Sequence, residues 1–283
     1  KIILVSMPAF GSTGPWANFR AYGSTVEQSS GLPHLNGSAE DLPTMHHVAY
    51  GDAVGGLNGA AALLVALRHQ ARTGLGQFVD VSQVEGLFPL ASHGIMEFSA
   101  NQRHPVRAGN RRDNVNPHGV YPCVGDDAWI VIQIYNDAQW QALRGMAAPY
   151  LDEFADRFGQ PEALDRSIAE WTKQQTAQAL MYALQARHVP AVVTNKASEL
   201  LTDAHLDEGG YWQWMDRAVV GNQPNPSPPF RVNAQRIKIG KPAPTLGQHN
   251  HEILVGELGI SQQQYELLIE RGIIGQRPRM PGS

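Results

Sequence analysis

Two short apolar segments on either side of one long helical pattern constrain the fold of this chain more than any other feature. Residues 2–6 have the pattern of a buried strand, and residues 77–82 alternate as a strand does. Between them, apolar side chains recur at helical spacing up to Arg72, with Asp52 placed as the N-cap and Gly74 as the C-terminal stop. Strands alternating with helices exclude an all-β fold and a pure helix bundle, and they predict an α/β or mixed fold.

The alternation continues through the rest of the chain. A helix is expected over residues 84–98, and a strand over 129–134 is followed by a helix that Asn136 caps. The other expected elements are helices at 137–146, 162–173, 176–188, 198–202, 249–258 and 262–271, and strands at 189–193 and 212–216. Four prolines in residues 222–229 predict a rigid surface loop there.

Charge and cysteine content exclude several classes of protein. The 283 residues carry a net charge of -4 with no run of Lys or Arg, so the chain lacks the electrostatic surface that nucleic acid or an anionic membrane requires. Its single cysteine, Cys123, excludes an internal disulfide framework and a Cys-rich zinc site. No apolar run approaches the roughly 20 residues that span a bilayer. We therefore expect a cytoplasmic protein with no nucleic-acid, membrane or metal partner.

Asp52 is the strongest single candidate for chemistry. A carboxylate at the start of a helix lies at the positive end of the helix dipole, which favours its ionised form. An ionised carboxylate beside the flexible Gly51 can attack an acyl group as a nucleophile. Because Asp is among the commonest capping residues, an ordinary cap is the more frequent role of such an aspartate, in about nine cases of ten.

Two other groups have a possible functional role and a more frequent structural one. His46 and His47 precede Asp52 and could orient it or act as a general base, although loop histidines at a surface are about four times more frequent. The segment from Gly109 to Arg112 could bind a phosphate through its guanidinium groups, although a solvated loop is about three times more frequent.

The order of several short motifs along the chain resembles the class III (CaiB/BaiF-type) CoA-transferases. The motifs that carry the resemblance are Phe10-Gly11 with Gly14-Pro15, Tyr22, Gly51-Asp52, Thr73-Gly74-x-Gly76-Gln77-x-Val79-Asp80, Gly109-Asn110, residues 242–249 and Glu257-Leu258-Gly259. They extend over nearly the whole chain, to about residue 275, and are collectively specific.

The resemblance implies a CoA-transferase with Asp52 as its nucleophile. CoA would move from an acyl-CoA donor to a small carboxylic acid through an aspartyl-CoA thioester, with CoA as part of the substrate and no metal. The residues it implies for CoA and substrate binding are Arg20, Ala21, Tyr22, Gly23, Gly51, Gly109, Asn110 and Arg111. A non-catalytic or regulatory domain of the same fold is the alternative. An acyl-CoA racemase is less favoured, because Tyr22 and Gly23 stand where that branch has a His and an acid.

The resemblance also implies an architecture. We expect a Rossmann-like large domain, incomplete here, with its remainder in residues 1–100, a smaller α/β domain in 101–240, and C-terminal helices in 241–283 that return to the large domain. The family's N-terminal Rossmann-type segment is expected to be missing, since the chain opens at Lys1 within a strand pattern. The implied partners are a second copy in an interlocked homodimer, or a missing N-terminal half.

Overall fold

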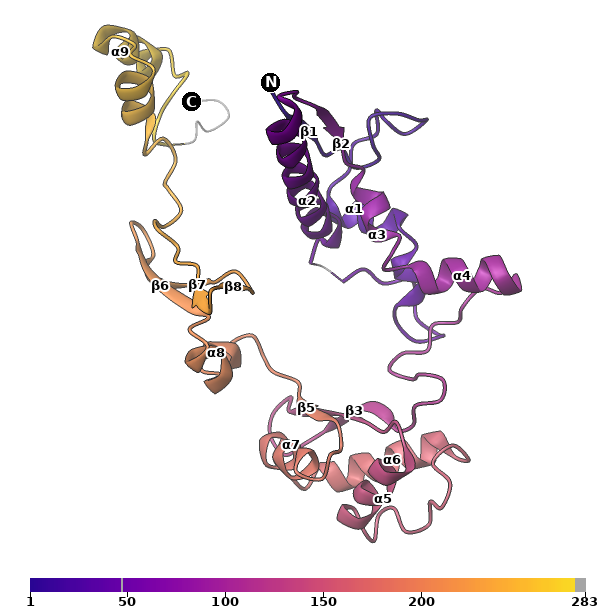
Figure 1. Ribbon diagram of the computed structural model, residues 1–283. Coiled ribbons are helices and arrows are strands. Elements are labelled where there is room, and N and C mark those ends of the chain that lie inside the picture. Colours follow the sequence, from indigo (N-terminus) through magenta and orange to yellow (C-terminus); the bar gives the residue numbers. More distant parts are fainter. Residues whose placement is uncertain (47, 278–283) are drawn as a thin grey trace. The chain divides into compact units, whose positions relative to one another are not determined.

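The chain alternates helices and strands, which confirms the predicted α/β class. The computed structural model describes residues 1–46 and 48–277, and the chain divides into two units, Lys1–Thr194 and Asn195–Ser283. Each unit has its own secondary structure, labelled in Figure 1.

The predicted strand–helix–strand element opens the first unit. Strand β1 (Leu4–Ser6) pairs in parallel with β2 (Phe78–Asp80), and the long helix α2 (Tyr50–Thr73) lies along them (Figure 1). Helix α2 ends at Gly74, whose φ of 74° is left-handed, as the sequence predicts. Because β1 and β2 run parallel, the segments that follow them lie at the same edge of the sheet.

Helix α2 packs through a stripe of very small residues. Its buried positions are Gly51, Gly55, Gly59 and Ala66. A Cβ atom on Gly59 would lie 2.1 Å from the Met7 sulfur, so only glycine permits this approach. The small stripe brings the helix backbone close to the segments that leave both strands.

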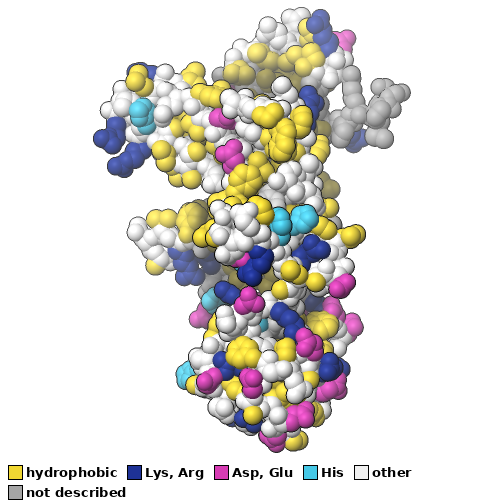
Figure 2. Space-filling model, turned by 90° about the vertical axis from the view of Figure 1, so that its right-hand side faces the viewer, with side chains coloured by type: hydrophobic (Ala, Val, Ile, Leu, Met, Phe, Trp, Pro, Cys, Tyr) yellow, Lys and Arg dark blue, Asp and Glu magenta, His cyan; other side chains and the backbone are white. Residues whose placement is uncertain are grey.

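Much of the remaining surface of α2 is apolar and exposed. Leu57, Leu64 and Val65 expose 74%, 67% and 70% of their surface. Helix α2 has 24 residues and an 18-residue window of mean hydropathy 1.3, 22% of it buried, so by length and composition it could cross a membrane. The expectation that no apolar run approaches that length was therefore wrong, although core helices of soluble proteins meet the same criterion. Figure 2 shows apolar side chains at the surface among the charged ones.

Three short helices and a 3₁₀ turn lie before and after α2 in the chain. They are α1 (Gly23–Ser29), η1 (Leu32–Leu35), α3 (Gln83–Leu87) and α4 (Ser92–Asn101). Helices α1 and α3 pack against α2, and a small core of Ala9, Val26, Val84 and Leu87 joins α1 to α3. The single helix expected over 84–98 is interrupted between α3 and α4, where Pro89 cannot donate a helical hydrogen bond.

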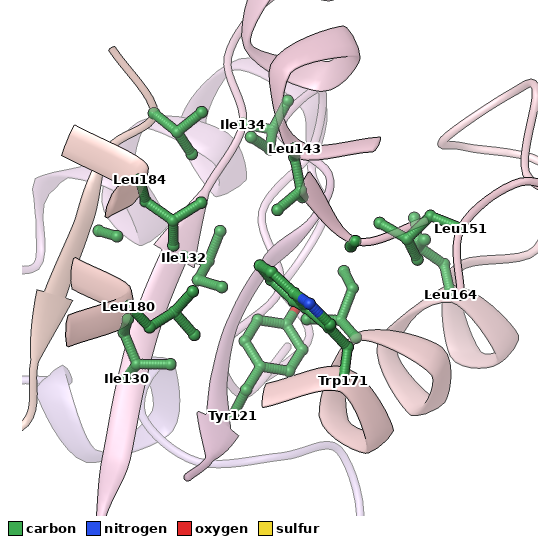
Figure 3. Packing of buried hydrophobic residues seen from close by; sticks show 14 of the residues in the cluster. Tyr121, Ile130, Ile132, Ile134, Leu143, Leu151, Leu164, Trp171, Leu180 and Leu184 are labelled. Carbon is green, nitrogen blue, oxygen red and sulfur yellow. The ribbon is translucent and has the colours of Figure 1, made fainter. Parts of the chain in front are cut away.

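The largest core lies between an antiparallel sheet and three helices. The sheet has the order β3 (His118–Pro122), β4 (Trp129–Gln133) and β5 (Ala191–Val193), and the helices are α5 (Asp137–Met146), α6 (Pro161–Thr172) and α7 (Ala177–Gln185). Figure 3 shows Ile130 and Ile132 of the sheet pointing toward Leu180 and Leu184 of α7, and all four are essentially inaccessible. Asn136 caps α5 by accepting a hydrogen bond from the Gln139 amide, as predicted.

The second unit contains short elements. They are η2 (Glu199–Leu201), α8 (Ala204–Glu208), β6 (Trp212–Arg217), β7 (Gly221–Pro226), β8 (Arg231–Val232), β9 (Gln235–Arg236), η3 (Glu252–Glu257) and α9 (Gln262–Glu270). The prolines of residues 222–229 do not prevent a strand, because β7 is paired on one side only and Pro224 and Pro226 lie opposite Trp214 and Trp212. The predicted loop was therefore wrong in its first half.

The predicted division at residues 100 and 240 stays a prediction. The small core around Val26 falls within residues 1–100, and the large core around Ile132 falls within 101–240. The boundary between the two units, at Thr194, lies elsewhere.

Candidate active site

Asp52 lies in the first turn of α2. Helix α2 begins at Tyr50 with Ala49 as its N-cap, so Asp52 is the third helical residue and the prediction that it caps the helix was wrong. Its amide donates to the Ala49 carbonyl at 3.0 Å, and its side chain is exposed. The carboxylate still lies within the first turn, where the helix dipole favours negative charge.

Gly23 contacts the Asp52 side chain. A Cβ atom built on Gly23 would lie 2.7 Å from both Cγ and Oδ2 of Asp52. A Cβ on Gly51 would lie 2.8 Å from the Val26 Cβ and 2.9 Å from the Gly23 carbonyl oxygen. Two glycines therefore let the first turn of α1 meet the first turn of α2, and the structure brings Gly23, Gly51 and Asp52 together as candidate site residues.

Two residues with polar side chains, Arg20 and Tyr22, lie just before α1. Tyr22 is the N-cap of α1 and its side chain is 85% exposed. Arg20 is exposed, and within residues 1–46 and 48–277 it has no carboxylate partner. Ala21 instead packs against the small core. Arg20 and Tyr22 are thus exposed just before the first turn of α1, whereas Ala21 holds the segment in place.

The loop residues predicted from the resemblance are held by other partners. The Arg111 guanidinium pairs with Glu162 at 2.9 Å and Asp165 at 3.2 Å, both on α6. The Gly109 amide donates to the Gly37 carbonyl at 2.8 Å, and the Asn110 carbonyl oxygen contacts His118 Nδ1.

Among the described residues, none of Gly109, Asn110 and Arg111 hydrogen-bonds or ion-pairs with Tyr22 or Asp52. The structure does not join this loop to the Asp52 group by a polar contact. Its assignment to CoA binding stays a prediction.

Glu27 was missed by the sequence analysis. It is completely buried in α1, and its Oε1 accepts a hydrogen bond from the His46 amide at 2.8 Å and lies 2.9 Å from His46 Nδ1. The available signal was its helical spacing from Gly23, which places both on one face of α1. His47 lies outside the described residues.

One cavity of the first unit is lined by residues other than Asp52. Its volume is about 880 Å³, and it is lined by η1, α4 and the segment that follows α4, including His34, Phe98 and Arg107. None of the candidate site residues lines it. In the part of the chain that the structure describes, no three His, Cys, Asp or Glu side chains are grouped to hold a metal.

Comparison with known proteins identifies the class. The model of the family described as CoA-transferase family III matches residues 1–250, and the chain belongs to this family. It is similar to the succinyl-CoA–D-citramalate CoA-transferase of Chloroflexus aurantiacus, with 30% identity over 96% of this chain and 69% of that protein. It is also similar to the succinate–glutarate CoA-transferase of Agrobacterium fabrum, with 26% identity over 90% of this chain and 65% of that protein.

A solved structure agrees with the family assignment. A CaiB/BaiF family protein from Brucella suis has a TM-score of 0.80 to this chain, with 26% identity, covering 90% of this chain and 68% of that one. The fold predicted from the resemblance is therefore confirmed. The chain spans about two thirds of the length of these relatives.

Proposed function

We propose that this chain carries the nucleophile of an acyl-CoA:carboxylate CoA-transferase, and that the nucleophile is Asp52. The observation that carries the proposal is the contact between Asp52 and Gly23, which places an exposed carboxylate where two helix starts meet. The carboxylate is exposed in the first turn of α2. The family membership supplies the chemistry that such a carboxylate would perform.

The proposed reaction needs no net proton transfer. The Asp52 carboxylate oxygen attacks the thioester carbonyl, the C–S bond breaks, and a mixed anhydride and CoA thiolate form. The thiolate then attacks the Asp52 carbonyl carbon, giving an aspartyl-CoA thioester and releasing the donor acid as its carboxylate. The acceptor carboxylate reverses these two steps and leaves as a new acyl-CoA. Each step exchanges one anionic leaving group for another, so a nucleophile and stabilisation of the developing oxyanion are sufficient.

We propose small dicarboxylic acids as the substrate class. The names of both relatives include dicarboxylic acids or their CoA thioesters, namely succinate, glutarate and citramalate. A dicarboxylate keeps one free carboxylate while the other reacts, and this group needs a cationic partner. The Arg20 guanidinium, exposed and two residues before Tyr22, provides a cation of the right chemistry, for that carboxylate or for a CoA phosphate.

We further propose that the protein acts in the cytoplasm as a homodimer, or with a partner that supplies a further part of the family's fold. The exposed apolar surface of α2 supports association, because contiguous apolar patches on proteins commonly mark interaction sites.

Chemical trapping tests the nucleophile. The protein is incubated with succinyl-CoA, treated with hydroxylamine, digested and analysed by mass spectrometry, with Asp52→Asn as the control. We expect an aspartyl hydroxamate at Asp52, because hydroxylamine attacks both the anhydride and the thioester. Modification at another carboxylate would contradict the assignment of Asp52. An unmodified chain that still binds CoA would support the non-catalytic alternative.

A further inference from the structure

The segment that precedes α2 is held by a buried carboxylate of another helix. Glu27 of α1 is completely buried, and its Oε1 is within hydrogen-bonding distance of both the backbone N–H and the Nδ1 atom of His46, at 2.8 and 2.9 Å. Its second oxygen, Oε2, is also buried and has no hydrogen-bond partner among the described residues. The two contacts to His46 are therefore the polar interactions that hold this carboxylate in place.

His46 in turn packs against Tyr50, the first residue of α2. Its imidazole ring packs edge-on against Tyr50, with 5.0 Å between ring centroids and 72° between planes. The N-cap residue Ala49 has a left-handed φ of 49° and offers no side-chain cap. Because local capping does not fix the start of α2, its position depends on contacts made by neighbouring segments such as His46.

The same helix also contacts the nucleophile. Gly23 and Glu27 are one turn apart on α1, so they share a face of that helix. Gly23 abuts the Asp52 carboxylate, while Glu27 holds the segment that leads to Asp52. Helix α1 therefore constrains Asp52 through two contacts. Gly23 contacts the Asp52 side chain, and Glu27 accepts a hydrogen bond from the backbone N–H of His46, in the segment before Asp52.

We propose that Glu27 and His46 form a positioning pair that orients Asp52 for attack on the acyl-CoA thioester. This inference rests on the proposed function of Asp52. Neither residue needs to touch the substrate. Glu27 holds His46 through its carboxylate, and His46 packs on Tyr50 at the start of α2. These contacts fix the first turn of α2, and the close contact with Gly23 sets the direction of the Asp52 side chain.

The test compares variants that break the pair with one that preserves it. Glu27→Ala removes both contacts, and His46→Ala removes the side-chain contact and the packing on Tyr50 but keeps the backbone N–H. Glu27→Gln keeps an oxygen that accepts the same two N–H groups. The matched control is Glu85→Gln, which changes an exposed glutamate on α3.

Single-turnover trapping of Asp52 with hydroxylamine gives the rate of acylation, and steady-state assays separate kcat from KM. We expect Glu27→Ala and His46→Ala to lower kcat and the acylation rate by about 10²-fold, the cost typical of a 1 Å misplacement, with KM for acyl-CoA little changed. Glu27→Gln should recover most of the rate, and Glu85→Gln should match the unsubstituted protein. Equal loss in Glu27→Gln and Glu27→Ala, or a change in KM alone, would overturn the positioning role.

Hydrogen exchange gives a readout that does not depend on activity. Peptides covering residues 43–53 should exchange faster in Glu27→Ala and in His46→Ala than in Glu27→Gln, while peptides from the large core keep their protection. If Glu27→Ala fails to fold, His46→Ala carries the comparison. If Asp52 of the unsubstituted protein is never acylated, the proposed function fails. Unchanged exchange at residues 43–53 in both alanine variants overturns the pairing itself.

Discussion

The α-carbon of Gly23 lies so close to the Asp52 carboxylate that a Cβ atom there would be 2.7 Å from Asp52 Cγ. The contact joins the first turns of two helices that are separated by a long, irregular segment of the chain. It makes the identity of residue 23 a determinant of where the carboxylate of residue 52 points.

Gly23→Ala is therefore expected to displace Asp52. A 2.7 Å contact forces the Asp52 side chain or the start of α1 to move, and a misplacement near 1 Å costs about 10²-fold in rate. Overpacking of this kind lowers the free energy of unfolding by about 1–3 kcal/mol. Trapping of Asp52 and urea denaturation measure the two effects.

Gly56→Ala is the matched control, because a Cβ on this α2 glycine would have nothing within 4 Å. It should keep full acylation and raise stability by up to about 1 kcal/mol, the difference in helix propensity. Equal loss of acylation in the two variants would contradict a local effect at Asp52.

Asp52→Asn should abolish acylation while the fold persists. The amide is a poor nucleophile, and the side chain of residue 52 does not cap α2, since Ala49 occupies the N-cap position. The only stability cost comes from the favourable position of the charge in the first turn, about 0.3–1 kcal/mol. Thermal unfolding followed by circular dichroism checks this. A loss well above that range would mean that Asp52 holds the fold as well as the reaction.

Local signals in the sequence predicted local structure well. The Asn136 cap and the Gly74 stop each depend on residues within one turn, so the pattern and the geometry coincide. The interruption between α3 and α4 was also readable, since Pro89 stands within the expected helix.

Contacts between distant segments were not predictable in the same way. The contact of Glu27 with His46 joins α1 to the segment before α2, and no periodicity of apolar residues in the sequence predicts it. Strand β7 was missed because its pairing with β6, rather than its own proline-rich sequence, makes it a strand. The resemblance to the family found Gly23 and Asp52 separately, and the structure shows that they touch.

Alkaline pH should destabilise the protein through Tyr121. Burial is the main cause that raises the pKa of this hydroxyl above its ordinary 10.0, and the nearby Asp165 carboxylate, to which it donates at 2.7 Å, raises it further. The folded chain therefore keeps a proton that the unfolded chain loses. The stabilisation is complete below about pH 10 and declines above it, by up to about 1.4 kcal/mol per pH unit.

Urea midpoints measured across about pH 9–11 check this effect. Tyr121→Phe should show a shallower decline, because the titrating group is gone. Tyr182→Phe, at a tyrosine that is 60% exposed, should follow the unsubstituted protein. A decline of the same slope in Tyr121→Phe would assign the alkaline sensitivity to other groups.

Helix α7 offers a paired test of the large core. Leu184 is inaccessible and faces the sheet, whereas Tyr182 of the same helix is 60% exposed. Leu184→Ala should lower the free energy of unfolding by about 2–5 kcal/mol, and Tyr182→Ala by less than about 0.5 kcal/mol. Chemical denaturation of both variants gives the comparison, and similar losses would mean that α7 does not pack as described.

The apolar surface of α2 predicts the effect of a charge placed on it. Leu64 is 67% exposed, and a glutamate at that position cannot be buried in an interface without a partner for its charge. If α2 lies in the proposed homodimer interface, Leu64→Glu should convert the dimer to a monomer with its circular dichroism unchanged. Sedimentation equilibrium measures the mass.

Val219→Glu is the matched apolar-to-acid change at a residue that is 84% exposed, at the turn between β6 and β7, and it should keep the dimer. A dimer that survives Leu64→Glu would place the interface elsewhere. An unsubstituted chain that is already monomeric would favour a different partner for α2.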